Sequence, residues 1–136
     1  MAQDLLSSFS EGFERSIDAF NSGDLDLAVA GLPEEIEWHT TPEDPERSVR
    51  RGPEAVKEWF RGFHEIFEEW RVETRGFEQL GESVVLANYV LQGKSQAAAV
   101  PVGIEVFEVW EFDGLRPTRV RQFRTREAAL SAVADS

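Results

Sequence analysis

The spacing of apolar residues predicts two helices near the start of the chain. Apolar side chains recur at intervals of three and four residues, at Leu6, Phe9, Phe13, Ile17 and Phe20. This spacing places them on one face of a helix. We expect the helix to end at residues 21–23, because Gly23 can adopt the left-handed conformation that commonly follows a helix. Asp24 is suited to cap a second, short helix, which Pro33 would end.

A strand, a loop and an aromatic helix are predicted next. Residues 36–40 alternate between apolar and polar and indicate a short strand, whereas 41–52 are rich in Pro, Glu and Arg and indicate an exposed loop. Pro53 suits the first turn of a helix. Apolar residues then keep a helical spacing to residue 70, at Val56, Trp59, Phe60, Phe63, Ile66, Phe67 and Trp70.

The second half of the chain predicts an antiparallel sheet. Four β-rich segments, 71–80, 83–93, 99–112 and 117–125, are separated by short turn sequences that contain glycine. An Ala-rich stretch at 127–134 indicates a final helical turn. Helices packed on one face of a curved antiparallel sheet make an α+β fold, here with three helices. No linker or repeat interrupts residues 1–136, so we expect a single domain.

Composition and charge narrow the possible partners. Of the 136 residues, 41% are apolar and 29% are charged, which is typical of a soluble protein. No apolar run approaches the ~20 residues of a membrane span, and the N-terminus lacks the pattern of a secretion signal, so a cytoplasmic location is expected. The 14 basic and 26 acidic residues give a net charge of −12. Nucleic acids and anionic membranes favour basic surfaces, so neither is an expected partner.

The residue inventory also argues against metals and cofactors. Cysteine is absent, which excludes thiolate-bound zinc, iron–sulfur clusters and a thiol nucleophile. The two histidines, His39 and His64, are remote from one another in sequence. A pair formed by His64 and Glu68 would lack the further ligands that a metal requires. We therefore expect neither a metal nor a cofactor.

One carboxylate stands out as candidate chemistry. Alternation along the third of the long strands places Ile104, Val106, Glu108, Trp110 and Phe112 on one face. Glu108 interrupts this apolar row, and burial would raise its pKa toward the range useful for acid–base catalysis. Three interpretations stay open for Glu108: a paired structural carboxylate, an anchor for a ligand, or a group that transfers a proton.

Alternation on the last strand suggests a partner for this carboxylate. Arg119, Arg121 and Phe123 share one face of that strand. If that face points inward, Arg121 would pair with Glu108 and keep it ionised. Trp38, Trp59 and Tyr89 are further candidates for the wall of a cavity, although aromatic residues often only fill a core. The complete predicted ligand-contacting set is Trp38, Trp59, Phe63, Tyr89, Val106, Trp110, Arg121 and Phe123.

Several short motifs resemble those of a known family. They are Phe-Asn-Ser-Gly-Asp-Leu-Asp at 20–26, Ile-Glu-Trp-His at 36–39, Arg-Gly-Pro-Glu-Ala-Val at 51–56 and Val-Trp-Glu-Phe-Asp-Gly at 109–114. Their order and spacing resemble the SnoaL-like branch of the nuclear-transport-factor-2-like superfamily. The resemblance implies a cone-shaped sheet wrapped round helices, with an enclosed apolar pocket. Members include ketosteroid isomerases, polyketide cyclases, epoxide hydrolases and dehydratases, so the fold alone does not settle the chemistry.

The resemblance permits a residue-by-residue test for steroid isomerisation. The isomerase uses an Asp base together with a Tyr and a protonated Asp that hold the oxyanion. These three positions correspond to Trp38, Ser16 and Glu108 here, so only one carboxyl group is kept. Two functions remain open. One is a protein that binds an apolar small molecule in an aromatic-lined pocket, and the other is an isomerase-like or polyketide-cyclase-like enzyme with Glu108 as acid or base.

The sequence also predicts a homodimer. Besides the row that contains Glu108, the 99–112 strand carries Val100, Val102, Phe107 and Val109, which gives it a two-sided apolar character. An apolar outer face needs cover, which a second copy could supply. The family resemblance implies dimerisation through the same face.

Overall fold

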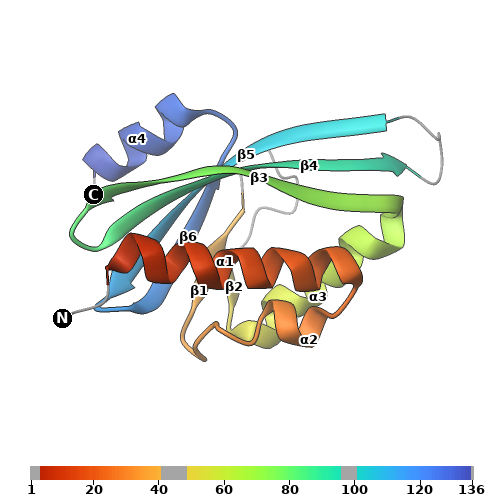
Figure 1. The fold of residues 1–136 in the computed structure, drawn as a ribbon, viewed down its shortest axis with the longest axis horizontal. Helices are drawn as coiled ribbons and strands as arrows, with labels where there is room; N and C mark the ends of the chain where they lie inside the picture. The colour runs from red at the N-terminus through yellow and green to blue at the C-terminus, as the bar shows by residue number, and fades with distance from the viewer. Residues whose placement is uncertain (1–3, 41–48, 96–100, 136) are drawn as a thin grey trace.

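A computed structural model describes residues 4–40, 49–95 and 101–135 of the chain (Figure 1). These residues form four helices and six strands. In chain order the elements are α1 (Leu5–Ser22), α2 (Leu25–Ala28), β1 (Glu37–His39), β2 (Val49–Arg51), α3 (Pro53–Ile66), β3 (Phe67–Gly81), β4 (Val84–Ser95), β5 (Pro101–Asp113), β6 (Arg116–Phe123) and α4 (Arg126–Ala134).

The six strands form one curved sheet in the order β2-β1-β6-β5-β4-β3. Neighbouring strands are antiparallel except β1 and β6, which run parallel and place Trp38 opposite Val120. Three register irregularities interrupt the pairing of β3 with β4. Irregularities of this kind bend a strand and increase its twist, which suits a sheet that curves around its contents. The expected α+β fold is confirmed.

Helix α1 ends where the sequence predicts, and Asp4 caps its start. The Asp4 side chain accepts a hydrogen bond from the backbone N–H of Leu6. Gly23 follows the helix with φ of 84°, and the next N–H, of Asp24, donates to the carbonyl of Ala19 at 2.9 Å. This left-handed cap favours glycine, because a Cβ would be strained there.

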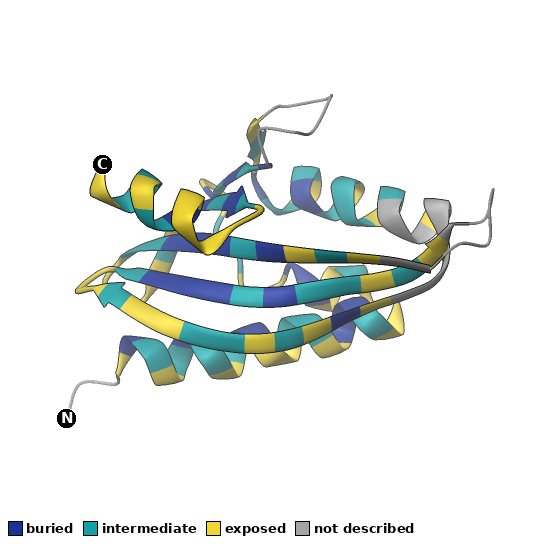
Figure 2. Cartoon of the chain, turned by 90° about the horizontal axis from the view of Figure 1, so that it is seen from above, coloured by how far each residue is buried: buried dark blue, intermediate teal, exposed yellow. Residues whose placement is uncertain are grey.

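The two faces of the sheet are covered by different helices. Figure 1 shows α1, α2 and α3 on one face and α4 on the opposite face. The inner cluster contains Phe9, Phe13, Phe20, Trp38, Tyr89 and Trp110. A smaller outer cluster of Leu86, Val109 and Ala129 lies beneath α4. Buried positions are accordingly concentrated in the middle strands, whereas the edge strand β3 is more exposed (Figure 2).

Four details of the predicted elements change. Helix α3 ends at Ile66, and β3 begins at Phe67, where the pattern predicted helix to residue 70. The predicted loop contains β2, which pairs with β1. The Ala-rich stretch forms a complete helix of nine residues. This helix makes a fourth where three were expected, and it lies on the outer face because Ala129 packs against Val109 and Leu86.

Helix α4 bears directly on the predicted dimer. It covers Val109, which is fully buried within the single chain. Phe107 is partly buried against the same cluster. The side chains of Val100 and Val102, the other two residues of the argument, lie outside the described residues. The described part of this apolar face is therefore covered largely by the chain itself.

Charged residues form a row across four strands on the outer face of the sheet. The register places Glu111, Arg119, Glu37 and Arg51 side by side on β5, β6, β1 and β2. Arg119 Nη2 lies 2.8 Å from Glu111 Oε1, and Arg51 Nη1 lies 3.1 Å from Glu37 Oε2. Alternating charges in adjacent strands favour this register over a slipped one.

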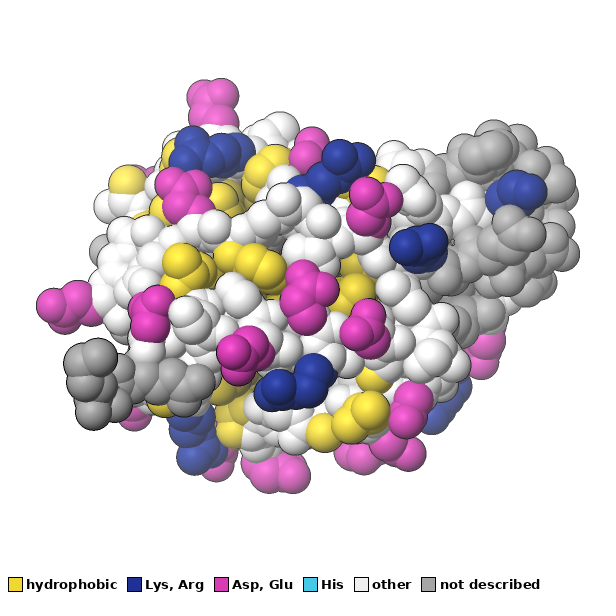
Figure 3. Space-filling model, viewed as in Figure 1, with side chains coloured by type: hydrophobic (Ala, Val, Ile, Leu, Met, Phe, Trp, Pro, Cys, Tyr) yellow, Lys and Arg dark blue, Asp and Glu magenta, His cyan; other side chains and the backbone are white. Residues whose placement is uncertain are grey.

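The molecular surface mixes charges with small apolar areas. On the face shown in Figure 3, acidic and basic side chains are interspersed, with apolar patches between them. Among the described residues, no helix is long and apolar enough to cross a membrane.

Candidate functional site

A cavity of about 1040 Å³ lies between the inner face of the sheet and the helices. Its walls are mainly apolar and aromatic, and side chains of α1, β1, α3, β4 and β5 contribute to them. The aromatic lining residues are Phe9, Phe13, Phe20, Trp38, Trp59, Phe60, Tyr89, Trp110 and Phe112. A volume of this size accommodates a ligand with several rings.

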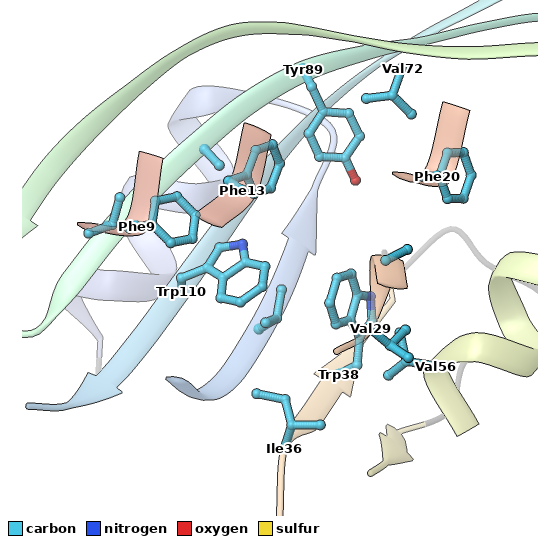
Figure 4. Packing of buried hydrophobic residues seen from close by; sticks show 14 of the residues in the cluster. Phe9, Phe13, Phe20, Val29, Ile36, Trp38, Val56, Val72, Tyr89 and Trp110 are labelled. Carbon is cyan, nitrogen blue, oxygen red and sulfur yellow. The ribbon is translucent and has the colours of Figure 1, made fainter. Parts of the chain in front are cut away.

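The aromatic walls are held by ring-to-ring contacts. The Trp38 ring centroid lies 5.6 Å from that of Trp110 and 5.8 Å from that of Phe60, both nearly perpendicular. Perpendicular packing of this kind is favourable, because a positive ring edge meets a negative ring face. The guanidinium of Arg50 lies 5.3 Å from the Trp59 ring centroid, within the range of a cation–π contact. Figure 4 shows Trp38, Trp110, Phe20 and Tyr89 arranged around a common interior.

Glu108 lies at the centre of the polar part of this wall. It projects inward from β5, lines the cavity and is 1% exposed. Its Oε2 accepts hydrogen bonds from the Tyr89 hydroxyl at 2.5 Å and from Gln122 Nε2 at 2.8 Å. Its Oε1 accepts one from Trp110 Nε1 at 2.9 Å. Three adjacent strands therefore each supply a donor to one carboxylate.

The pKa values of Glu108 and Tyr89 are shifted mainly because both groups are buried and no cation pairs with Glu108 among the described residues. Burial raises the pKa of Glu108, and the hydrogen bonds from Tyr89, Gln122 and Trp110 act in the opposite direction. Within the described residues Glu108 makes no ion pair. Burial and the neighbouring carboxylate both raise the pKa of Tyr89 well above its ordinary value. The hydroxyl therefore stays protonated at neutral pH and available as a donor to Glu108.

The predicted pairing of Arg121 with Glu108 is wrong. Arg121 lies on the outer face, where its Nε is 3.4 Å from Glu111 Oε2. Phe123, also predicted for the cavity, packs in the outer cluster beneath α4. The alternation of β6 has the opposite phase, so Val120 and Gln122 point inward. Gln122 is directly opposite Glu108 in the β5–β6 register and takes the place assigned to arginine.

Most other predicted residues do line the cavity. The structure brings together Glu108, Trp38, Trp59, Tyr89, Val106 and Trp110. Phe63 belongs to α3, but its side chain lies outside the described residues. Sequence reasoning found the apolar stripe of α1 but did not assign it to the cavity, and so missed Phe9 and Phe13 as wall residues. It also missed Gln122, whose only signal was its place across from Glu108.

Several other polar groups near the cavity are engaged or sealed. His39 alternates with Trp38 and contacts Glu37 at 3.2 Å on the outer face. Trp38 Nε1 and Thr40 Oγ1 are buried and have no hydrogen-bond partner, and neither atom is accessible. No group of three potential metal ligands occurs within the part of the chain that the structure describes.

The comparisons with known proteins agree with this architecture. The family model described as the SnoaL-like domain matches residues 13–120. The chain belongs to the SnoaL-like family. No curated protein sequence gives a significant match to this SnoaL-like domain.

Solved structures share the fold of this SnoaL-like domain at low sequence identity. An NTF2-like protein of unknown function from Burkholderia pseudomallei has a TM-score of 0.72 and 18% identity, covering 91% of this chain and 95% of that one. TerC, co-crystallised with polyporic acid, has a TM-score of 0.72 and 16% identity, with coverage of 95% and 99%. A Catenulispora acidiphila protein with a ketosteroid isomerase-like fold, in complex with trimethylamine, has a TM-score of 0.69 and 11% identity, with coverage of 96% and 92%.

At the three positions that the resemblance matches to the isomerase's functional residues, this SnoaL-like domain carries Ser16, Trp38 and Glu108. Ser16, which the family resemblance matches to the isomerase tyrosine, donates its hydroxyl to the Ala28 carbonyl at 2.6 Å. Trp38, which the resemblance matches to the base, has no basic atom. Only Glu108 keeps a carboxyl group, and neutral donors surround it. The arrangement can hold a ligand against a carboxylate, and Glu108 is the sole carboxyl group among the cavity residues apart from the exposed Asp18.

Proposed function

We propose that this SnoaL-like domain binds an apolar, ring-containing small molecule in the cavity between the sheet and α1–α3. The observation that carries the proposal is a cavity of about 1040 Å³ with aromatic walls and one compact polar cluster. Binding sites for small molecules typically combine a largely apolar lining with a few convergent polar groups. The cluster around Glu108 supplies those groups here.

The aromatic walls would provide most of the affinity. A ligand that buries roughly 300 Å² of apolar surface gains about 7 kcal/mol from leaving water. Part of this gain is offset by the freedom that the ligand loses on association. The Glu108 cluster therefore has the role of orienting the ligand and selecting among ligands of similar size.

A thermal-shift screen with steroids, flavonoids, polyketide mimics and terpenoids tests the proposal. A ligand present at 100 times its dissociation constant stabilises the fold by about 2.7 kcal/mol, which raises the melting temperature measurably. Two variants of neighbouring β5 residues locate the site. Ile104→Trp fills the cavity side, whereas Glu105→Trp adds the same ring on an exposed position. Binding lost only in Ile104→Trp supports the proposal, and equal binding by both variants contradicts it.

A second candidate function is proton transfer at a carbon next to a carbonyl group. It is favoured by a cavity-lining carboxyl group whose pKa is raised by burial, because a carboxylate with a higher pKa is a stronger base. Ionised Glu108 takes the C–H proton and leaves an enolate; the Glu108 carboxyl then exchanges its proton with D₂O and returns a deuteron to the carbon. Ring ketones in D₂O should therefore gain deuterium. Proton NMR of 2-tetralone with the wild type and with Glu108→Gln tests this. Exchange that is no faster with the wild type than with the variant contradicts the enzyme.

We further propose that the domain forms a homodimer through the outer face of its sheet. The family resemblance and the apolar residues of β5 support this, although α4 covers Val109. Sedimentation equilibrium at micromolar concentrations should give about twice the mass of the chain. A single-chain mass across that range would contradict the dimer.

A further inference from the structure

The donors of the polar cluster are all directed within the cluster. The Tyr89 hydroxyl and the Trp110 indole N–H each donate to Glu108. The side-chain amide nitrogen of Gln122 donates to Glu108 at 2.8 Å and lies 3.2 Å from the Tyr89 oxygen. The Glu108 carboxylate thus accepts hydrogen bonds from a phenol, an indole and an amide. Every N–H and O–H of these three side chains is therefore directed at Glu108 or at the Tyr89 oxygen, and none is left for a ligand.

The group left for a ligand is an acceptor. The side-chain carbonyl of Gln122 accepts no hydrogen bond from the described residues. It is also absent from the set of sealed polar atoms, in contrast to Trp38 Nε1 and Thr40 Oγ1. Gln122 lines the cavity from the inward face of β6, so its carbonyl is accessible from that side. The carboxylate fixes this orientation, because a reversed amide would set two oxygens against each other without a proton.

The charge of Glu108 favours the same class of ligand as the free Gln122 carbonyl does, because it disfavours anionic acceptors. Glu108 is fully buried and meets only neutral donors, so when it is ionised its negative charge is not neutralised by an arginine or lysine. Arg119 and Arg121 of β6 contact Glu111 on the opposite face. Arg15 and Arg124 line the cavity as exposed residues and form no ion pair with Glu108. In a low-dielectric interior a second negative charge is strongly disfavoured beside the first. The cavity should therefore disfavour a ligand carboxylate placed beside ionised Glu108.

We propose that the cavity selects ring ligands that carry a hydrogen-bond donor, such as a hydroxyl or an amine, and discriminates against the matching ether, ketone and carboxylate. The donor is received by the Gln122 carbonyl, and the rings lie against the aromatic walls. This inference rests on the proposed binding function and specifies its ligand class. The polarity is the reverse of an oxyanion site, where the protein donates and the ligand accepts.

A series of biphenyls that differ in one substituent tests the inference. The probes are 4-phenylphenol, 4-methoxybiphenyl, 4-acetylbiphenyl and biphenyl-4-carboxylate, titrated at pH 7 by isothermal calorimetry. Quenching of tryptophan fluorescence gives a second readout, because Trp38, Trp59 and Trp110 line the cavity. The phenol should bind about tenfold more tightly than the ether and the ketone, which corresponds to one good hydrogen bond. The carboxylate should bind most weakly.

Two variants connect the preference to the cluster. Gln122→Met removes the acceptor with little change in volume and should bring the phenol and ether affinities within about twofold of one another. Gln92→Met makes the same change at an exposed position of β4 and should leave the tenfold preference intact. Glu108→Gln removes the charge that fixes the donors, so the ketone should gain affinity relative to the phenol. This variant gives an independent test if Gln122→Met fails to fold.

The outcomes separate the inference from the function on which it rests. A tenfold phenol preference that Gln122→Met abolishes and Gln92→Met keeps supports the inference. Equal affinities across the four probes, or tightest binding of the carboxylate, overturn it and leave the binding function standing. Absence of binding by all four probes and by the wider ligand panel overturns the binding function, and the inference with it.

Discussion

Replacing Glu108 by Gln should remove a pH dependence from the stability of the fold. Burial raises the pKa of Glu108 in the folded state above the ordinary value of 4.5. At a pH between 4.5, the ordinary value that applies to the unfolded chain, and the higher pKa of the folded state, the folded chain holds a proton that the unfolded chain has released. Stability from this group is therefore fully present below about 4.5, and it is lost as the pH rises through the folded-state pKa.

The size of the effect follows from one proton. Wild-type stability relative to the variant should fall with rising pH by at most about 1.4 kcal/mol per pH unit within that window. The substitution also has a pH-independent cost. In the variant, the carbonyl of the new Gln can accept the hydrogen bonds that Tyr89 and Gln122 donate to Oε2 in the wild type. Its NH₂ group then faces the Trp110 N–H, which in the wild type donates to Oε1 at 2.9 Å. A lost buried hydrogen bond of this kind costs about 1–3 kcal/mol.

Urea unfolding of both proteins from pH 4.5 to pH 8.5 measures the difference directly. Carboxylates with lowered pKa values, such as Glu37, give the opposite pH dependence, but they are common to both proteins and cancel. Tyr89 titrates above this range. A free-energy difference that stays flat, or that grows in favour of the wild type as the pH rises, would refute the assignment of Glu108 as a buried carboxylate with a raised pKa.

Three further substitutions test the packing around the site, each by urea unfolding at pH 7. Thr40→Val replaces a sealed, unpartnered hydroxyl by a methyl group and should stabilise the fold by about 1 kcal/mol, whereas a loss would show a hidden partner. Asn21→Ala removes both hydrogen bonds between α1 and the backbone of Val72, and should cost about 2 kcal/mol; no loss would contradict the tie. Gly52→Ala places a Cβ 3.2 Å from the Glu34 carbonyl at φ of +85°, and should cost about 1–2 kcal/mol; an unchanged midpoint would exclude strain.

The sequence predicts the helical layer well because its signals are local. The stripe from Leu6 to Phe20 and the Gly23 cap each depend on neighbouring residues. The boundary between α3 and β3 was less predictable, because Phe67 and Trp70 continue the helical spacing of α3 although they belong to β3. Strand β2 has only three residues, and its pairing with β1 leaves no periodic pattern.

The inward face of β6 illustrates what a sequence pattern cannot specify. Both faces of this strand are partly apolar, because Val120 packs inward and Phe123 packs beneath α4. Alternation identifies a buried face only when the other face meets water. The phase of β6 is set by its register with β5, which shifts between Glu111 and Phe112. That shift decides whether Arg121 or Gln122 meets Glu108, and no local pattern encodes it.

The parallel pairing of β1 with β6 has a consequence for the order in which the chain is completed. Residues 37–39 leave the ribosome long before residues 119–121, their partners in the sheet. Until β6 emerges, β1 can pair only with β2, and Trp38 lacks the Trp110 ring that packs against it. Nascent chains therefore expose tryptophan surface for most of synthesis, which makes them targets for chaperones and proteases. The wall of the cavity is complete only after β6, the last strand, has been made.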